Sequence, residues 1–286
     1  MTQMLEPGLR LLRAPNPSPM THTGTNTYLL GQGPVAVIDP GPGDPAHLDA
    51  ILAATGGQVS HIFVTHAHLD HAALAPALAA ATGAPVLAFG DARAGRSEVM
   101  QRMADAGGGE GVDRDFRPDW HLADGEAVTG PDWTLTALWT PGHFCNHLSF
   151  AWGDALFTGD LVMGWASSLV SPPDGDLTQF MSSCRRLATG RWRRFHPGHG
   201  DPIDDPKRRL HWLISHRQER EAQILDCLAD GPARPGELVS RIYTGIEPHL
   251  LPAAERNVLA HLVDLTVRGL VRPEPDLGPT ALFQKR

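Results

Sequence analysis

Short apolar runs separated by Gly, Pro and Asp dominate the first two-thirds of the chain. Ala- and Leu-rich stretches over 46–54 and 72–81 are each followed by glycine and predict helices. The β-branched and aromatic runs predict strands over 27–30, 35–38, 61–64, 86–88, 134–139, 147–152 and 155–157. The alternation of strands and helices predicts a layered α/β fold, and the later strands fit the second sheet of a sandwich.

The pattern changes near residue 205. A long amphipathic run over 207–228 predicts a helix, and two further helical runs are followed by a pair of short strand signals. Three helices and a hairpin describe a winged-helix-like appendage. We therefore expect a first domain over 1–204 and a winged-helix-like domain over 205–286. The polar segment 90–119, broken by three consecutive glycines, predicts an insertion or a lid.

Composition limits the classes of protein that fit. The chain has 286 residues, 42% hydrophobic and 20% charged, which suits one large domain with a small appendage. The formal net charge is -8, so the chain as a whole lacks the attraction to phosphate backbones that nucleic-acid-binding proteins use, although a local basic patch remains possible. Three well-separated cysteines without a CxxC pair exclude a disulfide framework.

Location follows from what the sequence lacks. It has no apolar run of the ~20 residues that a membrane span needs, and its first residues are interrupted by prolines and do not resemble a signal peptide. We expect a cytoplasmic protein that is not bound to a membrane.

The residues with the clearest chemistry follow the predicted strand at 61–64. The segment Thr65-His-Ala-His-Leu-Asp-His71 holds four side chains that can bind metal within six residues. In an extended segment His66 and His68 point to the same side. Asp70 and His71 can then face the same space from the start of the next helix. Imidazole nitrogens and a carboxylate suit zinc and similar divalent metals.

Three further segments place candidate ligands on rigid turns after predicted strands. They are Thr140-Pro-Gly-His143, Thr158-Gly-Asp160 and His196-Pro-Gly-His-Gly200. A single PGH turn is common, but the four segments in this order are specific.

Together the four segments resemble those of the metallo-β-lactamase-fold hydrolase superfamily, over roughly residues 20 to 204. The resemblance implies an αββα sandwich with a metal pair at the edge between its sheets. It implies that His66, His68 and His143 hold one metal, that Asp70, His71 and His199 hold the second, and that Asp160 bridges the two. Asp70 and Asp160 are the implied catalytic residues.

The mechanism implied by this resemblance is hydrolysis by hydroxide held between two divalent cations, which attacks a carbonyl carbon or a phosphorus atom. Zinc is the expected metal, and manganese and iron remain alternatives because they use the same donors.

The C-terminal pattern resembles the winged-helix appendage of the β-lactamase-like protein 2 group. That group includes a single-strand endoribonuclease and fungal thioesterases, so the resemblance does not fix one substrate. Four functions stay open. The first is hydrolysis of a small ester or thioester, and the second is cleavage of RNA at the same site. A true β-lactamase fits less well, because the chain has Asp160 where a cysteine ligand would be expected and no signal peptide. A non-enzymatic metal protein fits less well, because the ligand set is complete. The oligomeric state is open.

Several other residues have both a functional and a structural interpretation. Asp39, after the strand 35–38, is a candidate to support the candidate metal loop, residues 65–71. For His147 a structural role is the preferred interpretation, and for His22 an ordinary position in a polar loop is preferred. The arginines between 185 and 194 could bind an anionic substrate, but a solvated helix end fits them better.

Overall fold

The computed structural model describes residues 2–109 and 111–286. Its first sheet has seven strands, in the order in which they occur along the chain. These are β1 (Gln3–Glu6), β2 (Leu9–Arg13), β3 (Asn26–Leu30), β4 (Val35–Ile38), β5 (Val59–Phe63), β6 (Val86–Ala88) and β7 (Trp120–His121). The first four strands are antiparallel neighbours, and β4 to β7 are parallel.

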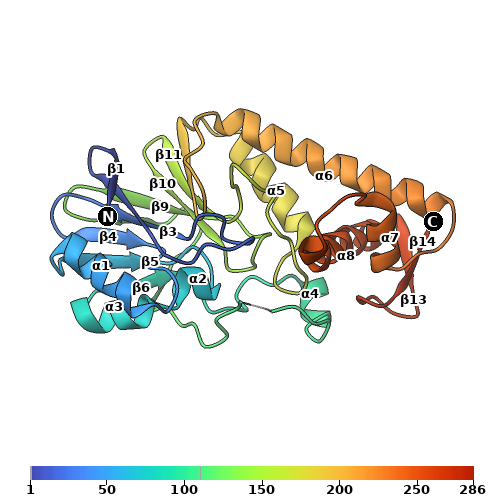
Figure 1. Ribbon diagram of the computed structural model, residues 1–286, viewed down its shortest axis with the longest axis horizontal. Helices are drawn as coiled ribbons and strands as arrows, with labels where there is room; N and C mark the ends of the chain where they lie inside the picture. Colours follow the sequence, from blue (N-terminus) through green and yellow to red (C-terminus); the bar gives the residue numbers. More distant parts are fainter. Residues whose placement is uncertain (1, 110) are drawn as a thin grey trace.

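The second sheet has five strands and faces the first (Figure 1). Their spatial order is β12 (Arg194–Pro197), β11 (Ala155–Gly159), β10 (Leu148–Trp152), β9 (Thr134–Trp139) and β8 (Ala127–Thr129). Only β11 and β12 are parallel. Phe63 of the first sheet and Phe150 of the second meet edge to face, with ring centroids 5.2 Å apart.

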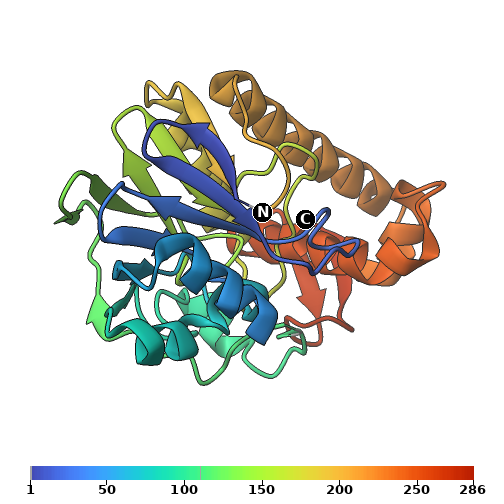
Figure 2. The same cartoon turned by 60° about the vertical axis from the view of Figure 1, so that its left-hand side comes forward.

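Side-chain alternation along the strands creates two apolar layers from one sheet. In β4, Val35 and Val37 pack outward, whereas Ala36 and Ile38 pack toward the second sheet. The outward side is covered by α1 (Pro45–Thr55) and α3 (Ala75–Thr82). Figure 2 shows these two helices on the face of the first sheet that points away from the second. Each strand contributes to both apolar layers, because successive strand residues point to opposite faces of the sheet.

The outer face of the second sheet is covered by α5 (Leu177–Ala188) and the first half of α6 (Pro206–Ala229). Helices therefore enclose both sheets, and the expected αββα sandwich is confirmed. Helix α6 begins where the Asp205 carboxylate accepts the Arg208 N–H, with Pro206 in the first turn.

The predicted helix over 72–81 is divided in the structure. A short helix α2 (Leu69–Ala72) ends before α3 begins at Ala75. The physical reason is Pro76, which has no N–H to donate and is tolerated only in the first turn of a helix. The N-terminal hairpin β1–β2 and helix α5 were absent from the strand and helix predictions.

The C-terminal region packs around a core of its own. Helix α6 runs past the sandwich, and its second half packs with α7 (Pro235–Ile242), α8 (Leu251–Val267) and the hairpin β13 (Val271–Glu274) and β14 (Leu282–Lys285). A 3₁₀ turn (Pro248–Leu250) precedes α8. Leu213 of α6 thus belongs to the sandwich core and Ile224 to the C-terminal core. The boundary at 204/205 stays a prediction.

The segment 90–119 joins these two parts. Helix α4 (Glu98–Arg102) places Met100, followed by Met103, in the C-terminal core. The next residues return toward the sandwich, where His68 forms an isolated bridge with Val112. The segment is therefore packed against both cores, and its expected role as a lid stays a prediction.

We predict that His196 makes folding sensitive to acid. Its ring is fully buried, and burial lowers its pKa from 6.5 to about 4, with Glu6 opposing the shift. The unfolded chain therefore binds a proton more readily than the folded chain. The contribution of His196 to the free energy of unfolding is complete above pH 6.5 and is lost as pH falls toward 4. Urea titrations at pH 7, 5.5 and 4.5 should show a smaller loss of unfolding free energy in His196→Gln than in the wild type. The same dependence of unfolding free energy on pH in the two proteins would contradict this role of His196.

Candidate metal centre

The candidate ligands converge at one edge of the sandwich because each follows the end of a strand. Residues 65–71 follow β5, the turn of His143 follows β9, Asp160 follows β11 and His199 follows β12. Two glycines permit this convergence. A Cβ on Gly142 would lie 2.2 Å from the Cα of Phe180 in α5, and one on Gly198 would lie 2.4 Å from Asp160 Oδ1. The Pro-Gly turns are therefore required by close packing.

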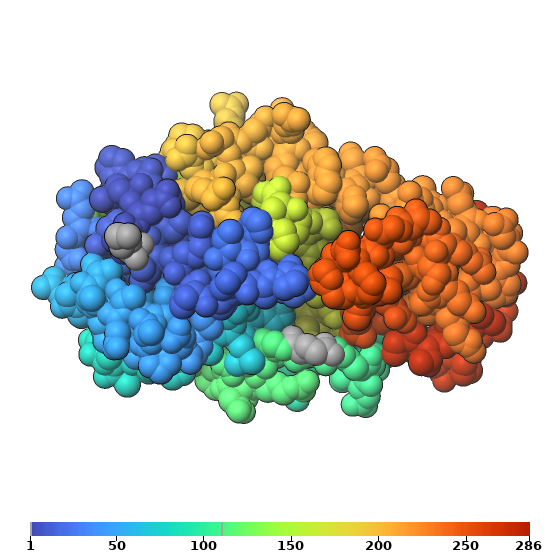
Figure 3. All heavy atoms as spheres, viewed as in Figure 1, coloured from blue at the N-terminus to red at the C-terminus, as the bar shows by residue number. Residues whose placement is uncertain are grey.

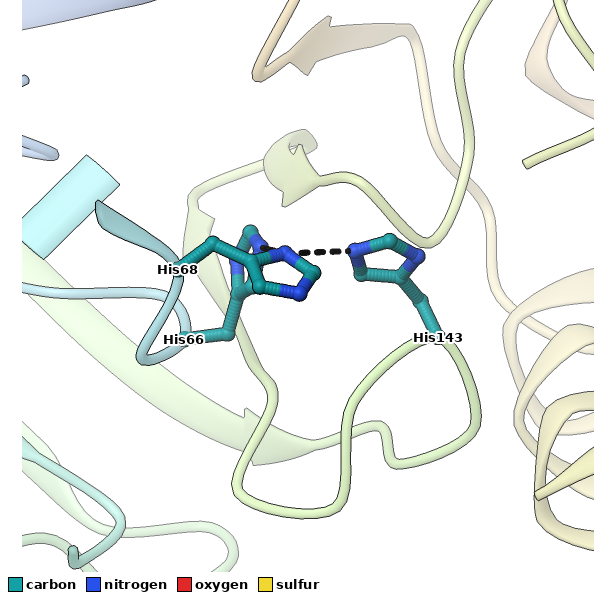
Figure 4. A group of neighbouring side chains, drawn as sticks. All are labelled: His66, His68 and His143. Atoms are coloured by element: carbon teal, nitrogen blue, oxygen red, sulfur yellow. Dashed lines mark hydrogen bonds between the residues drawn. The ribbon is translucent and has the colours of Figure 1, made fainter. Parts of the chain in front are cut away.

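His66, His68 and His143 form the first group of donors (Figure 4). The Nε2 atom of His66 lies 2.9 Å from Nδ1 of His68, and Nε2 of His143 lies 3.2 Å from the same atom. The side chains come from two separate loops and point toward one another. Ring nitrogens gathered at this spacing are typical of ligands to one cation.

Asp70, His71 and His199 form the second group. Asp70 Oδ2 lies 3.3 Å from Nε2 of His71 and 3.2 Å from Nε2 of His199. Asp160 lies between the two groups. Its Oδ1 is 3.5 Å from His71 Nε2, and its Oδ2 is 3.3 Å from His199 Nε2 and 3.8 Å from His143 Nε2. All seven sequence-predicted ligands thus lie together, while their roles stay predictions.

Hydrogen bonds to oxygen acceptors fix the orientation of four imidazoles. Nδ1 of His66 lies 3.0 Å from Thr65 Oγ1, and Nδ1 of His71 lies 2.9 Å from Asp39 Oδ2. Likewise, Nδ1 of His143 donates to Leu169 O and Nδ1 of His199 donates to Gly24 O. In each ring Nε2 is therefore the nitrogen that faces the cluster, where it can bind a metal once it carries no proton.

The pKa values divide the donors into two electrostatic sets. Burial lowers the pKa of His66 and His143, and it lowers that of His68 to about 3, so these rings are neutral donors. Burial also acts on His71 and His199, but neighbouring carboxylates outweigh it. They raise the pKa of His71 well above its ordinary value and that of His199 to about 9.

Both carboxylates are ionised. Burial alone would raise the pKa values of Asp70 and Asp160, but the adjacent histidines hold them well below the ordinary value. Asp160 Oδ1 is also buried without a hydrogen-bond partner among the described residues. A pair of carboxylates that stabilises positive imidazolium can equally stabilise a cation, so the donor set fits divalent metal ions.

A cavity of about 330 Å³ opens over these groups. His68, Asp70 and Asp160 line it together with Met20 and Leu169. The N-terminal loop thus approaches the site, where Thr25 Oγ1 donates to Asp70 Oδ2 at 3.2 Å. His22, at a positive φ of 55°, stacks on Trp165 with centroids 4.8 Å apart. No local sequence signal points to Thr25, because 45 residues separate it from Asp70.

The remaining candidates have structural surroundings. Asp39 accepts the backbone N–H and hydroxyl of Thr65 as well as the ring of His71, so it supports the metal loop. His147 is buried, and its Nδ1 lies 3.0 Å from Thr140 Oγ1. Arg193 and Arg194 form ion pairs with surface acids and do not line the cavity.

Comparison with known proteins agrees with this geometry. The model of the metallo-beta-lactamase superfamily matches residues 20–199. The chain belongs to the metallo-beta-lactamase superfamily. A beta-lactamase associated winged helix domain matches residues 235–278, which confirms the predicted nature of the C-terminal region.

Two curated relatives of this superfamily hydrolase cover most of the chain. A beta-lactamase-like protein 2 homolog of Drosophila melanogaster is 31% identical and covers 95% of this chain and 92% of its own length. An atrochrysone carboxyl ACP thioesterase of Aspergillus fumigatus is 29% identical and covers 84% of this chain and 75% of its own. A metallo-beta-lactamase family protein of Thermus thermophilus superposes with a TM-score of 0.79 at 30% identity, over 99% of this chain and all of its own.

No helix in the described ranges is long and apolar enough to cross a membrane.

We predict that three variants of the candidate metal centre lose different amounts of bound metal. His68→Ala should lose roughly one equivalent per chain, His199→Ala should lose the other, and Asp160→Ala should weaken both because its carboxylate faces both groups. Elemental analysis after dialysis measures the metal content.

His196→Gln is the matched control, because His196 lies three residues before His199 but contacts Glu6 instead of the cluster. It should retain the full metal content. Retention of both equivalents by His68→Ala would contradict the assignment.

Proposed function

We propose that this chain hydrolyses small esters or thioesters with two divalent metal ions, zinc being the expected metal. The observation that carries the proposal is the composition of the cavity wall. Among the described residues that line it there is no lysine or arginine, whereas Met20, Val112 and Leu169 supply apolar surface. A phosphodiester chain would meet no lysine or arginine there to pair with its successive phosphates, so a substrate without phosphate charges fits better.

Metal ions bound at this site would supply a strong nucleophile from water at neutral pH and polarise the substrate carbonyl. The chain's own residues provide the rest. Asp70 and Asp160 are ionised, so each can accept a hydrogen bond from the attacking water and orient it. The hydroxyl of Thr25 fixes the carboxylate of Asp70 by donating to it.

Thioesters suit this site better than alkyl esters or amides. A thiolate leaves without prior protonation, because its conjugate acid has an ordinary pKa near ~8.5. Among the described lining residues there is no tyrosine, lysine or cysteine that could serve as a separate acid for a poorer leaving group. The thioesterase among the relatives supports the same choice.

A second cavity extends the site toward the C-terminal region. Its volume is about 430 Å³, and it shares Met20, Leu169 and Ser171 with the cavity over the candidate metal centre. Its far side is formed by α8, where Ala253 and Leu259 are apolar and Glu255 and Arg256 are charged. In Figure 3 the blue N-terminal segment meets the orange C-terminal helices beside this region. An elongated substrate would place its reacting carbonyl at the cluster and its apolar end against Ala253 and Leu259.

We predict turnover of a medium-chain acyl thioester by the metal-loaded protein, measured by release of free thiol. His68→Ala should reduce kcat/KM by roughly a hundredfold or more, since even residues behind the ligands affect activity by ~10–100-fold. A lactone, single-stranded RNA and nitrocefin should be tested in parallel. Cleavage of RNA with no thioester turnover would refute the proposal in favour of a ribonuclease.

We also predict that Ala253→Trp discriminates between substrates by length. The indole would fill part of the second cavity, so kcat/KM for a long acyl thioester should fall about tenfold while that for an acetyl thioester changes little. Ala222→Trp, on the exposed side of α6, is the control. Equal losses for both substrates would show that the second cavity does not hold the acyl chain.

A further inference from the structure

One candidate metal ligand is held in place by the C-terminal region. His143 donates its Nδ1–H to the carbonyl oxygen of Leu169 at 2.7 Å. This bond fixes which ring nitrogen carries the proton and aims Nε2 at His68 and Asp160. The orientation of His143 therefore depends on where the backbone of residue 169 lies.

The backbone around Leu169 does not adopt its shape unaided. Ser168 has a positive φ of 63°, a conformation that residues with a side chain rarely adopt and that persists only when the surroundings impose it. Its hydroxyl donates to Leu161 O at 3.1 Å. Further restraints on this loop come from helices α6 and α8.

Arg217 of α6 supplies two of these restraints. Its Nη2 donates to Ser167 O at 3.0 Å and to Ser168 O at 2.6 Å. Its Nη1 donates to the side-chain oxygen of Asn257 at 2.9 Å. The guanidinium also lies over the ring of Phe180, 5.2 Å from its centroid.

Asn257 of α8 supplies the third restraint. Its Oδ1 accepts the backbone N–H of Val170 at 3.1 Å in addition to the Arg217 guanidinium. Its Nδ2 donates to Ala253 O, one turn earlier in α8, which fixes the orientation of the amide. Peptide groups on both sides of Leu169 are thereby tied to the C-terminal region.

We propose that Arg217 and Asn257 are positioning residues, which hold the 167–170 loop so that Leu169 O orients His143 for metal binding. The winged-helix-containing region would then have a role in the metal site without contributing a ligand. This inference rests on the proposed use of metal at the site.

Burial of Arg217 is consistent with a specific role. The residue is 3% exposed, and burial lowers the pKa of its guanidinium to about 10, so it stays charged at neutral pH. A buried charge is costly unless hydrogen bonds satisfy it. Here neutral oxygen atoms of the loop and of Asn257 accept from Nη1 and Nη2, while Nε has no partner among the described residues, which couples the charge to one arrangement of the loop.

Titration of chelator-treated full-length protein with Co²⁺, followed by visible absorption, tests the proposal. In Asn257→Leu one of the two equivalents should bind ~10–100-fold more weakly, while the other keeps its wild-type affinity. Asn257→Asp keeps the oxygen that Val170 and Arg217 use, so it should bind both equivalents nearly as the wild type does. Arg217→Lys, which cannot reproduce the fork of donors, should also weaken one equivalent.

The control is Val258→Ala, which removes buried apolar volume from the next residue of α8 without touching the loop. Thermal unfolding of every variant shows how far each is destabilised. Wild-type affinity in Asn257→Leu and Arg217→Lys, or an equal loss of affinity in Val258→Ala, would overturn the positioning role. A wild-type protein that binds no Co²⁺ would instead overturn the proposed function and this inference with it.

Discussion

Assembly of a charged cluster at the edge between two apolar sheets is the constraint on which the rest of this structure depends. Seven imidazole and carboxylate side chains meet there, five of them buried and His68 and Asp70 half-buried, and such groups are costly to bury unless each is paired. The strand ends bring them close, the Pro-Gly turns permit the approach, and a surrounding layer of hydrogen-bond acceptors orients the rings.

The acceptors in that layer come from distant parts of the chain. Asp39 follows β4, Gly24 belongs to the N-terminal loop, and Leu169 lies on a loop held by α6 and α8. Because each acceptor is fixed by its own hydrogen bonds, the geometry of the cluster depends on elements from both cores. The C-terminal helices therefore matter to the site in two ways, by bounding the second cavity and by holding the loop of Leu169.

Much of the architecture could be predicted from sequence, because strands buried on both faces, such as Val35–Ile38 and Ala155–Gly159, contain continuous apolar runs. The strands β3, β4 and β6 lie within one residue of their predicted ranges, β5 begins two residues earlier than predicted, and α6 nearly matches its predicted range. The hairpin β1–β2 was missed because Gln3–Glu6 is exposed or half-buried and its pattern is not distinctive. The helix predicted over 72–81 begins at Ala75 in the structure, because Pro76 is tolerated only in the first turn of a helix.

The amino-acid sequence alone identifies which residues are chemically competent, since His66 to His71, His143, Asp160 and His199 stand in short segments with recognisable spacing. Their convergence at one edge of the sandwich, with Asp160 between the two groups, is decided by the folded chain, because the segments are separated by tens of residues. The same holds for Thr25, Leu169, Arg217 and Asn257. Their contributions are single hydrogen bonds made across the fold, and a hydrogen bond between distant residues leaves no periodicity or local motif in the sequence.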